Sequence, residues 1–151
     1  MHLHQYIGKK NPFNEGLFDK YDIPAREKIK NILKEFVIDN PDIYAQDLII
    51  TDPTCKYKYL ELQVCATWVG DKYPFDKIFV YERKRRYNND TLFLTLSKHF
   101  DKGYIFDADS FKDAPPRRIK KYSREFVYDV PWNKVMHVYV DNLEKEEILM
   151  Y

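Results

Sequence analysis

Glycine is scarce in this sequence, with only 4 residues in a chain of 151. The phosphate-binding loop of nucleotide hydrolases and the nucleophile elbow of serine hydrolases both need closely spaced glycines. Only glycine lets the backbone approach a phosphate or make so sharp a turn. Neither pattern occurs in the chain, so both enzyme classes are poor candidates.

Cysteine is rarer still, because Cys55 and Cys65 are the only two and they form no CxxC pair. Both lie in or beside the same predicted strand, where the extended chain between them would measure roughly 30 Å. That separation is too long for a disulfide, and the spacing does not suit a zinc site. The histidines show no metal-ligand spacing apart from His2 and His4 near the N-terminus.

A large net charge and long apolar runs are also missing. The 25 basic and 24 acidic residues nearly cancel, so only local patches can attract nucleic acid or a membrane. The apolar runs are too short for a membrane-spanning helix, and the N-terminus lacks a signal pattern. We therefore expect a cytoplasmic or nuclear protein that is not secreted and has no membrane partner.

The chain does contain enough apolar material for a folded domain, since 44% of its residues are hydrophobic and 17% aromatic. We expect an irregular N-terminal arm over residues 1–20, where glycine, proline and asparagine are scattered. A single domain over residues 21–151 follows it. The frequent use of Lys, Asn, Tyr and Ile is typical of an AT-rich genome, such as that of a large DNA virus.

The apolar residues show first a helical and then a β-strand period. Spacings of three and four residues predict a helix over residues 24–38. Residues 57–68 alternate between two faces and are predicted to be a central strand with one nearly apolar face. That face carries Lys58, Leu60, Leu62, Val64, Ala66 and Trp68.

Further strands are indicated by short runs rich in β-branched and aromatic residues. These runs are residues 44–51, 77–83, 91–97, 104–108, 125–129 and 135–140. The connection at residues 112–121 is expected to be exposed, and residues 141–147 form an acidic end. One helix followed by about seven strands predicts an α+β fold (α/β in the broad sense) with a central mixed sheet.

A candidate metal site lies on the predicted central strand. Glu61 and Gln63 stand two residues apart, so their side chains emerge on the same face. Asp47 lies on the preceding strand, and a hairpin would bring its carboxylate near Glu61. Two carboxylate oxygens and a carbonyl suit Mg²⁺, which can lower the pKa of a bound water and stabilise charge on a phosphate oxygen. The alternative is a polar sheet face that holds no metal.

A helix, a strand with an acid and a strand carrying Glu-x-Lys form the core of the PD-(D/E)XK nuclease superfamily, which includes restriction enzymes. Residues 22–84 resemble that core, with Asp47 as the acid and Glu61-Leu62-Gln63 as the variant motif. The resemblance implies a restriction-endonuclease-like core in which Asp47 and Glu61 hold Mg²⁺. It also implies that Gln63 helps to position the attacking water.

The positive charge of the motif has two candidate sources. Gln63 is neutral and stands where the superfamily carries Lys. Lys77 or Lys84, on the next predicted strand, could supply the missing charge. The predicted catalytic group is therefore Asp47, Glu61, Gln63 and Lys77, with Asp47 and Glu61 as the metal ligands.

The acids also have alternatives. Asp52, which precedes Pro53, competes with Asp47 as the first acid, although it lies in a predicted turn. Glu35, on the flank of the predicted helix, is a candidate for the helix acid that some members of the superfamily use.

Two basic clusters give the neutral chain local attraction for an anionic polymer. The first is flanked by tyrosines, a combination that suits a phosphate backbone and stacked bases, although charged strand ends are often simply solvated. The predicted nucleic-acid-binding residues are Arg83, Lys84, Arg85, Arg86, Arg117, Arg118, Lys120 and Lys121.

These patterns together favour a metal-dependent nuclease-like domain that acts on DNA, as an endonuclease or exonuclease that hydrolyses phosphodiester bonds. The alternative is a non-catalytic nucleic-acid-binding or structural module that uses the basic segment 83–86. A third hypothesis is a homo-oligomeric scaffold, and a homodimer is compatible with each of the three.

Overall fold

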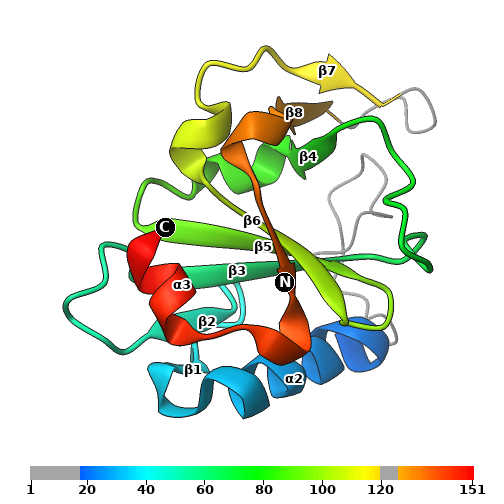
Figure 1. Ribbon diagram of the computed structural model, residues 1–151. Helices are drawn as coiled ribbons and strands as arrows, with labels where there is room; N and C mark the ends of the chain where they lie inside the picture. The colour runs from blue at the N-terminus through cyan, green and yellow to red at the C-terminus, as the bar shows by residue number, and fades with distance from the viewer. Residues whose placement is uncertain (1–17, 120–125) are drawn as a thin grey trace.

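The computed structural model describes residues 18–119 and 126–151, which form three layers (Figure 1). A six-stranded sheet lies in the middle. Helices α2 (Ile23–Leu33) and α3 (Lys145–Met150) pack on one side of it, and a three-stranded sheet packs on the other. The predicted α+β class is thus confirmed, with a mixed central sheet.

The six-stranded sheet has the order β1-β2-β3-β5-β6-β9. Its strands are β1 (Val37–Asp39), β2 (Leu48–Ile50), β3 (Tyr59–Cys65), β5 (Thr91–Ser97), β6 (Lys102–Asp107) and β9 (Met136–Tyr139). All neighbours are antiparallel except β3 and β5, which run parallel at the centre. The predicted central strand is therefore β3, although it is shorter than expected, and the hairpin of β5 and β6 is confirmed.

The three-stranded sheet has the order β4-β8-β7. It consists of β4 (Ile78–Tyr81), β8 (Phe126–Val130) and the short β7 (Arg117–Arg118). The sequence predicted about seven strands in one sheet, whereas the described residues contain nine strands in two sheets. The difference arises because β4 pairs with the distant β8 and not with its neighbours in the chain. Local patterns do not encode such pairing.

The first helix ends earlier than its apolar period predicts. Helix α2 stops at Leu33, a 3₁₀ turn follows over Lys34–Phe36, and β1 begins at Val37. Lys34 has a φ of 52°, in the left-handed region that a continuing helix cannot use. The prediction that the helix continues to residue 38 was therefore wrong.

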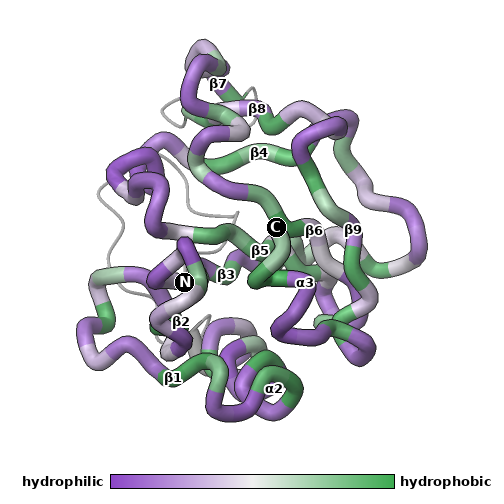
Figure 2. Tube along the Cα trace, turned by 60° about the vertical axis from the view of Figure 1, so that its left-hand side comes forward, coloured by the Kyte–Doolittle hydropathy of each residue, from purple (hydrophilic) through white to green (hydrophobic). Residues whose placement is uncertain are grey.

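The apolar face of β3 forms the core beneath the helices. Leu60, Leu62 and Val64 are buried in one cluster with Ala25 and Ile29 of α2. Hydrophobic and hydrophilic residues alternate along α2 in Figure 2, as expected for a helix with one buried stripe.

The other face of β3 meets the three-stranded sheet. Phe93 and Phe106 stack between the two sheets with ring centroids 5.4 Å apart. Trp68 also packs on this side, contrary to the predicted face, because β3 ends at Cys65 and the chain then turns. Glu61 and Gln63 face this layer too, so the layer controls their exposure.

Several other expectations can be compared with the described residues. Cys55 and Cys65 are both free and buried. The acidic end includes the first turn of α3, which is stabilised by a capping box between Glu144 and Glu147. No helix in residues 18–119 or 126–151 has the length and apolar character needed to span a membrane. Most of the expected arm, residues 1–20, lies outside the described residues.

Gly103 of β6 offers a test of the packing between β5, β6 and β9. A Cβ atom at this position would lie 2.7 Å from Leu94 Cδ1 and 3.1 Å from the Thr95 carbonyl oxygen. We expect Gly103→Ala to lower the free energy of unfolding by about 1–3 kcal/mol, because the backbone oxygen cannot move away cheaply. Urea unfolding measures this change.

Gly70 is the matched control, since a Cβ atom there would meet no atom of the described residues within 4 Å. Gly70→Ala should leave stability unchanged or raise it by up to about 1 kcal/mol. Equal effects of the two substitutions would contradict the packing described for β6.

Candidate active site

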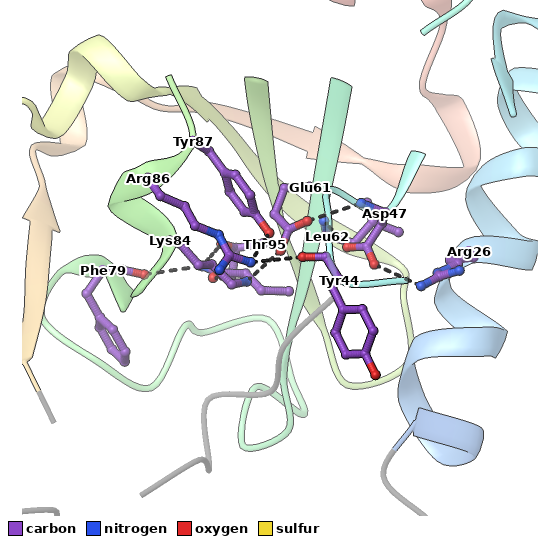
Figure 3. Close-up of polar contacts among 11 residues, drawn as sticks. Arg26, Tyr44, Asp47, Glu61, Leu62, Phe79, Lys84, Arg86, Tyr87 and Thr95 are labelled. Atoms are coloured by element: carbon purple, nitrogen blue, oxygen red, sulfur yellow. Dashed lines mark hydrogen bonds and ion pairs between the residues drawn. The ribbon is translucent and has the colours of Figure 1, made fainter. Parts of the chain in front are cut away.

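Four polar side chains are almost fully buried where β2, β3 and the turn after β4 meet (Figure 3). They are Asp47, Glu61, Gln63 and Lys84, each with at most 1% of its surface exposed. Together with Arg26 of α2 we call them the buried cluster. A buried charge is costly unless it is paired, so the contacts within the cluster determine what it can do.

The two acids of the cluster are linked by hydrogen bonds from backbone N–H groups just before β2 and within β3. The Asp47 backbone N–H donates to Glu61 Oε1 at 3.2 Å, and the Leu62 N–H donates to Asp47 Oδ2 at 2.9 Å. Arg26 donates to Asp47 Oδ1 at 3.2 Å. The expected approach of Asp47 to Glu61 is confirmed, although Asp47 lies one residue before β2 and not within a long strand.

Lys84 is the cation nearest to Glu61 in the described contacts. Its Nζ lies 3.2 Å from Glu61 Oε2 and 3.2 Å from Gln63 Oε1. Among the described residues, Glu61 Oε2 has no well-directed hydrogen bond, so its contact with Lys84 is electrostatic. A lysine from outside β3 thus occupies the space beside the acid and the amide of the Glu-x-Gln sequence.

Gln63 is oriented by its two donated hydrogen bonds. Its Nε2 donates to Thr95 Oγ1 at 2.7 Å and to the Phe79 carbonyl oxygen at 3.2 Å. Because Thr95 lies opposite Gln63 on the parallel neighbour β5, the pairing of the strands fixes this contact. The amide oxygen is therefore left facing Lys84.

The inward position of Lys84 follows from a 3₁₀ turn, η3 (Glu82–Arg86), which continues from β4. A 3₁₀ helix has three residues per turn, so residues three apart share a side. Tyr81, Lys84 and Tyr87 are all buried, in agreement with this period. The sequence was interpreted as a strand here, and a Tyr-x-x-Lys-x-x-Tyr spacing was the signal that could have revealed the buried lysine.

Burial shifts the ionisation of the Glu61–Lys84 pair. Loss of hydration raises the pKa of Glu61 to about 7, and the neighbouring Asp47 carboxylate adds to the rise. Loss of hydration also lowers the pKa of Lys84, against the opposing attraction of Glu61. The two pKa values therefore move towards each other, which suits a site that exchanges protons near neutral pH.

Asp22, at the start of α2, is a third buried acid close to the cluster. It precedes the helix but makes no capping hydrogen bond with its side chain, and its Oδ1 has no hydrogen-bond partner in the described part of the chain. Burial raises the pKa of Asp22 to about 7, and Asp47 contributes to the rise. The sequence indicated Asp22 only as a helix start.

The remaining candidate acids and Lys77 lie elsewhere. Lys77 is exposed just before β4, at the opposite end of that strand from Lys84. Asp52 lies in a turn, where its carboxylate accepts hydrogen bonds from Thr54 at 2.7 and 2.8 Å. Glu35 is exposed in the 3₁₀ turn after α2. In the described contacts of the cluster, the cation beside Glu61 is therefore Lys84 and not Lys77, which the sequence predicted.

The first basic cluster is divided by the 3₁₀ turn. Lys84 points inward, contrary to its expected place on a nucleic-acid-binding surface, whereas Arg85 and Arg86 are exposed. The Arg85 guanidinium lies 4.4 Å from the Tyr128 ring centre, and Arg86 donates to the Tyr44 carbonyl oxygen at 2.9 Å. The Arg83 guanidinium stacks on the ring of Tyr81, the residue just before the turn.

The second basic cluster is only partly described. Arg117 and Arg118 are exposed on β7, and Arg117 makes a two-point contact with Asp129 at 2.8 and 2.9 Å. Lys120 and Lys121 lie outside the described residues.

No protein-family model matches this chain, and no curated protein was found to match it. The functional argument therefore depends on the chemistry of the buried cluster.

The cluster offers Mg²⁺ two carboxylate ligands, Asp47 and Glu61. No three His, Cys, Asp or Glu side chains gather closely enough to hold a metal in residues 18–119 and 126–151. Mg²⁺, however, is commonly bound by one or two carboxylates together with water and substrate phosphate. Asp47 and Glu61 supply two carboxylates, and a carboxylate oxygen can accept more than one contact.

Asp22 makes the stability of the fold depend on pH. The folded-state pKa of about 7 exceeds the ordinary value of 3.8, so the folded chain binds more protons than the unfolded chain between these values. Stability should therefore fall as pH rises from about 4 to 7, by about 2–4 kcal/mol for this group. Asp22→Asn should be more stable than the parent at pH 8, and the difference should shrink at pH 5.

Unfolding by urea at the two pH values measures this effect, with Asp113→Asn as the control, because Asp113 is exposed. The stability of the Asp22→Asn protein should keep the part of the pH dependence that comes from Glu61, whose pKa is also raised. If Asp22→Asn had the same pH profile as the parent, Asp22 would not be buried as described.

The Glu61–Lys84 pair predicts strong coupling between the two positions. Lys84→Met leaves a buried carboxyl group without its cation and should cost about 3–5 kcal/mol of unfolding free energy. Glu61→Gln combined with Lys84→Met removes both charges and should recover much of that loss. A double-mutant cycle measures the coupling.

Lys112→Met is the control for removal of a lysine, since Lys112 is exposed, and it should change stability by at most about 0.5 kcal/mol. Additive effects of the two cluster substitutions would show that the ion pair is absent.

Proposed function

We propose that this domain is a metal-dependent nuclease-like enzyme that hydrolyses phosphodiester bonds in DNA, with Asp47, Glu61 and Lys84 at its centre. The observation that carries the proposal is the position of Lys84 Nζ, 3.2 Å from both Glu61 Oε2 and Gln63 Oε1. An active site of the PD-(D/E)XK kind, which the sequence resembles, requires two acids and a cation. Lys84 supplies the cation that Gln63 cannot, and its source is the turn after β4.

Asp47 and Glu61 are the residues that would hold Mg²⁺, which lowers the pKa of a bound water and stabilises charge on a phosphate oxygen. Lys84 can contribute in two ways. In its protonated form it donates hydrogen bonds to an anionic phosphate. Because burial lowers its pKa, it also releases a proton closer to neutral pH than an exposed lysine, as a general base must.

Gln63 and Arg26 act on these groups as positioning residues. Gln63 presents its amide oxygen to Lys84 because its nitrogen is engaged by Thr95 and Phe79. Arg26 holds one oxygen of Asp47 at 3.2 Å. Such supporting contacts keep reacting groups in a fixed geometry, on which catalysis depends.

The turn η3 also connects the cluster to a surface that suits a nucleic-acid backbone. Lys84 points into the cluster, while the following Arg85 and Arg86 are exposed. Arginine is well suited to phosphate contacts. A strand held by Arg85 and Arg86 would therefore lie on the turn that carries Lys84.

A second candidate function is nucleic-acid binding without cleavage. It is favoured by the observation that each carboxylate oxygen of Asp47 and Glu61 already has a partner. Arg26 and Lys84 balance the two acids, so the cluster needs no metal to remain buried. On this hypothesis the cluster is structural and the exposed arginines bind the ligand.

Both candidate functions predict that the protein binds nucleic acid, but only the first predicts that it cleaves DNA. We expect the parent protein to cleave end-labelled DNA in the presence of Mg²⁺ or Mn²⁺. Asp47→Asn, Glu61→Gln and Lys84→Ala should each lower the rate by roughly a hundredfold or more, because the first two would remove a metal ligand and the third the group that contacts the phosphate or takes up a proton. Gel electrophoresis of single- and double-stranded substrates measures the rate.

Asp113→Asn is the control and should cleave as the parent does, since Asp113 is exposed away from the cluster contacts. Binding is measured in parallel in EDTA, where the cluster variants should still bind. Undiminished cleavage by Asp47→Asn or Glu61→Gln would contradict the catalytic proposal. Binding by the parent with no cleavage in either metal would favour the second candidate.

A further inference from the structure

Two adjoining cavities lie beside the three-stranded sheet, apart from the buried cluster. Their volumes are about 380 and 670 Å³, within the range of small-molecule sites. Lys77, Arg117 and Asp129 line both of them. The two cavities therefore adjoin at these three residues, and we call them together the Lys77 groove.

Each cavity of the Lys77 groove contains one large aromatic side chain with an exposed surface. Phe75 lines the first cavity and is 43% exposed, and Trp132 lines the second and is 44% exposed. Large aromatic rings favour burial, so two such rings in one groove indicate a surface that a ligand covers.

Both rings are held in place by the protein. The Trp132 indole N–H donates to the Asp76 carbonyl oxygen at 2.7 Å, and the ring meets Tyr73 and Tyr104 edge to face. Phe75 makes similar contacts with Tyr73 and Phe79. Rings fixed before a ligand arrives lose little entropy on binding.

The groove is connected to the candidate active site through β4. Phe79 lines the first cavity, and its carbonyl oxygen accepts the hydrogen bond from Gln63. Its ring lies 5.9 Å from that of Tyr81, and the Arg83 guanidinium lies 4.5 Å from the Tyr81 ring centre. A path of aromatic rings thus runs from the basic turn η3 to the groove.

The charges of the second cavity favour an anionic ligand. Arg117 is already paired with Asp129, so these two residues largely neutralise each other. Lys77 is exposed and lines both cavities, and the neighbouring Arg118 of β7 is also exposed. Asp76 lines only the first cavity, so the second carries a net positive charge.

We infer that the Lys77 groove binds unpaired bases of a single-stranded nucleic acid, with Phe75 and Trp132 as stacking residues and Lys77 as a phosphate contact. Fixed aromatic rings beside cations are what binding of a single strand requires. The inference rests on the proposed function and deepens it, because it assigns a single-stranded segment to the substrate. It also gives Lys77 a role that differs from the catalytic role predicted from the sequence.

Two fluorescence measurements in EDTA test this inference without depending on cleavage. One is the tryptophan emission of the parent, and the other is the anisotropy of fluorescein-labelled oligothymidylate, which gives the affinity of every variant, including those that lack Trp132. Trp68 is fully buried whereas Trp132 is exposed, so a change in tryptophan emission on adding oligothymidylate should come from Trp132. The affinity of Phe75→Leu and Trp132→Leu for the oligonucleotide should fall roughly five- to a hundredfold each, as expected for loss of a stacked base. Lys77→Gln should weaken binding and reduce its salt dependence.

Three comparisons separate stacking from general attraction. An abasic strand of the same length carries the phosphates without the bases and should bind the parent more weakly than oligothymidylate does. Trp132→Phe retains a ring and should bind more tightly than Trp132→Leu. Tyr139→Leu removes a ring that is 58% exposed on β9, outside the groove, and should bind as the parent does.

The inference is overturned if folded Phe75→Leu and Trp132→Leu proteins bind oligothymidylate as tightly as the parent, or if the abasic strand binds equally well. Either result would leave the groove as a surface for a different ligand, such as an apolar peptide. Loss of binding in these variants together with no cleavage by the parent would support the groove and contradict the catalytic proposal. Cleavage by the parent together with unchanged binding by the variants would support the catalytic proposal and contradict the role inferred for the groove.

Discussion

The pairing of Glu61 with Lys84 is the interaction on which the rest of the structure depends. Both side chains are buried between the two sheets, so neither can keep its charge unless the other stays 3.2 Å away. Glu61 is placed by the centre of the six-stranded sheet, and Lys84 is placed by the turn after β4. The ion pair therefore requires the two sheets to pack in one arrangement, and it places a cation beside two acids.

Around this pair, each supporting contact comes from a different element. Thr95 of β5 and Phe79 of β4 orient Gln63, while Arg26 of α2 holds Asp47. Such a network is costly to bury and is not the simplest way to stabilise a small domain, because apolar residues of similar volume often do as well. The proposed catalytic role would give a reason for its presence. The aromatic path along β4 links the same network to the Lys77 groove.

The sequence predicted those features that depend on local period and short connections. The alternation of residues 57–68 identified the central strand and placed Glu61 and Gln63 on one face, and the short connection to the preceding strand brought Asp47 close. It named Lys84 as an alternative to Lys77 but put Lys77 in the catalytic group and Lys84 on the nucleic-acid-binding surface, because a strand and a 3₁₀ turn place the same residue on different sides. The pairing of β4 with β8 was also missed, since nothing local relates two strands so far apart.

The central claim is that Lys84 takes the place of the lysine that the nuclease motif would carry at residue 63. The most direct measurement compares metal-dependent DNA cleavage by Lys84→Gln with cleavage by the exchange variant, Gln63→Lys combined with Lys84→Gln. The account predicts that Lys84→Gln is inactive and that the exchange restores a measurable part of the parent rate, because a cation returns beside Glu61. Parent-like cleavage by Lys84→Gln alone would contradict it.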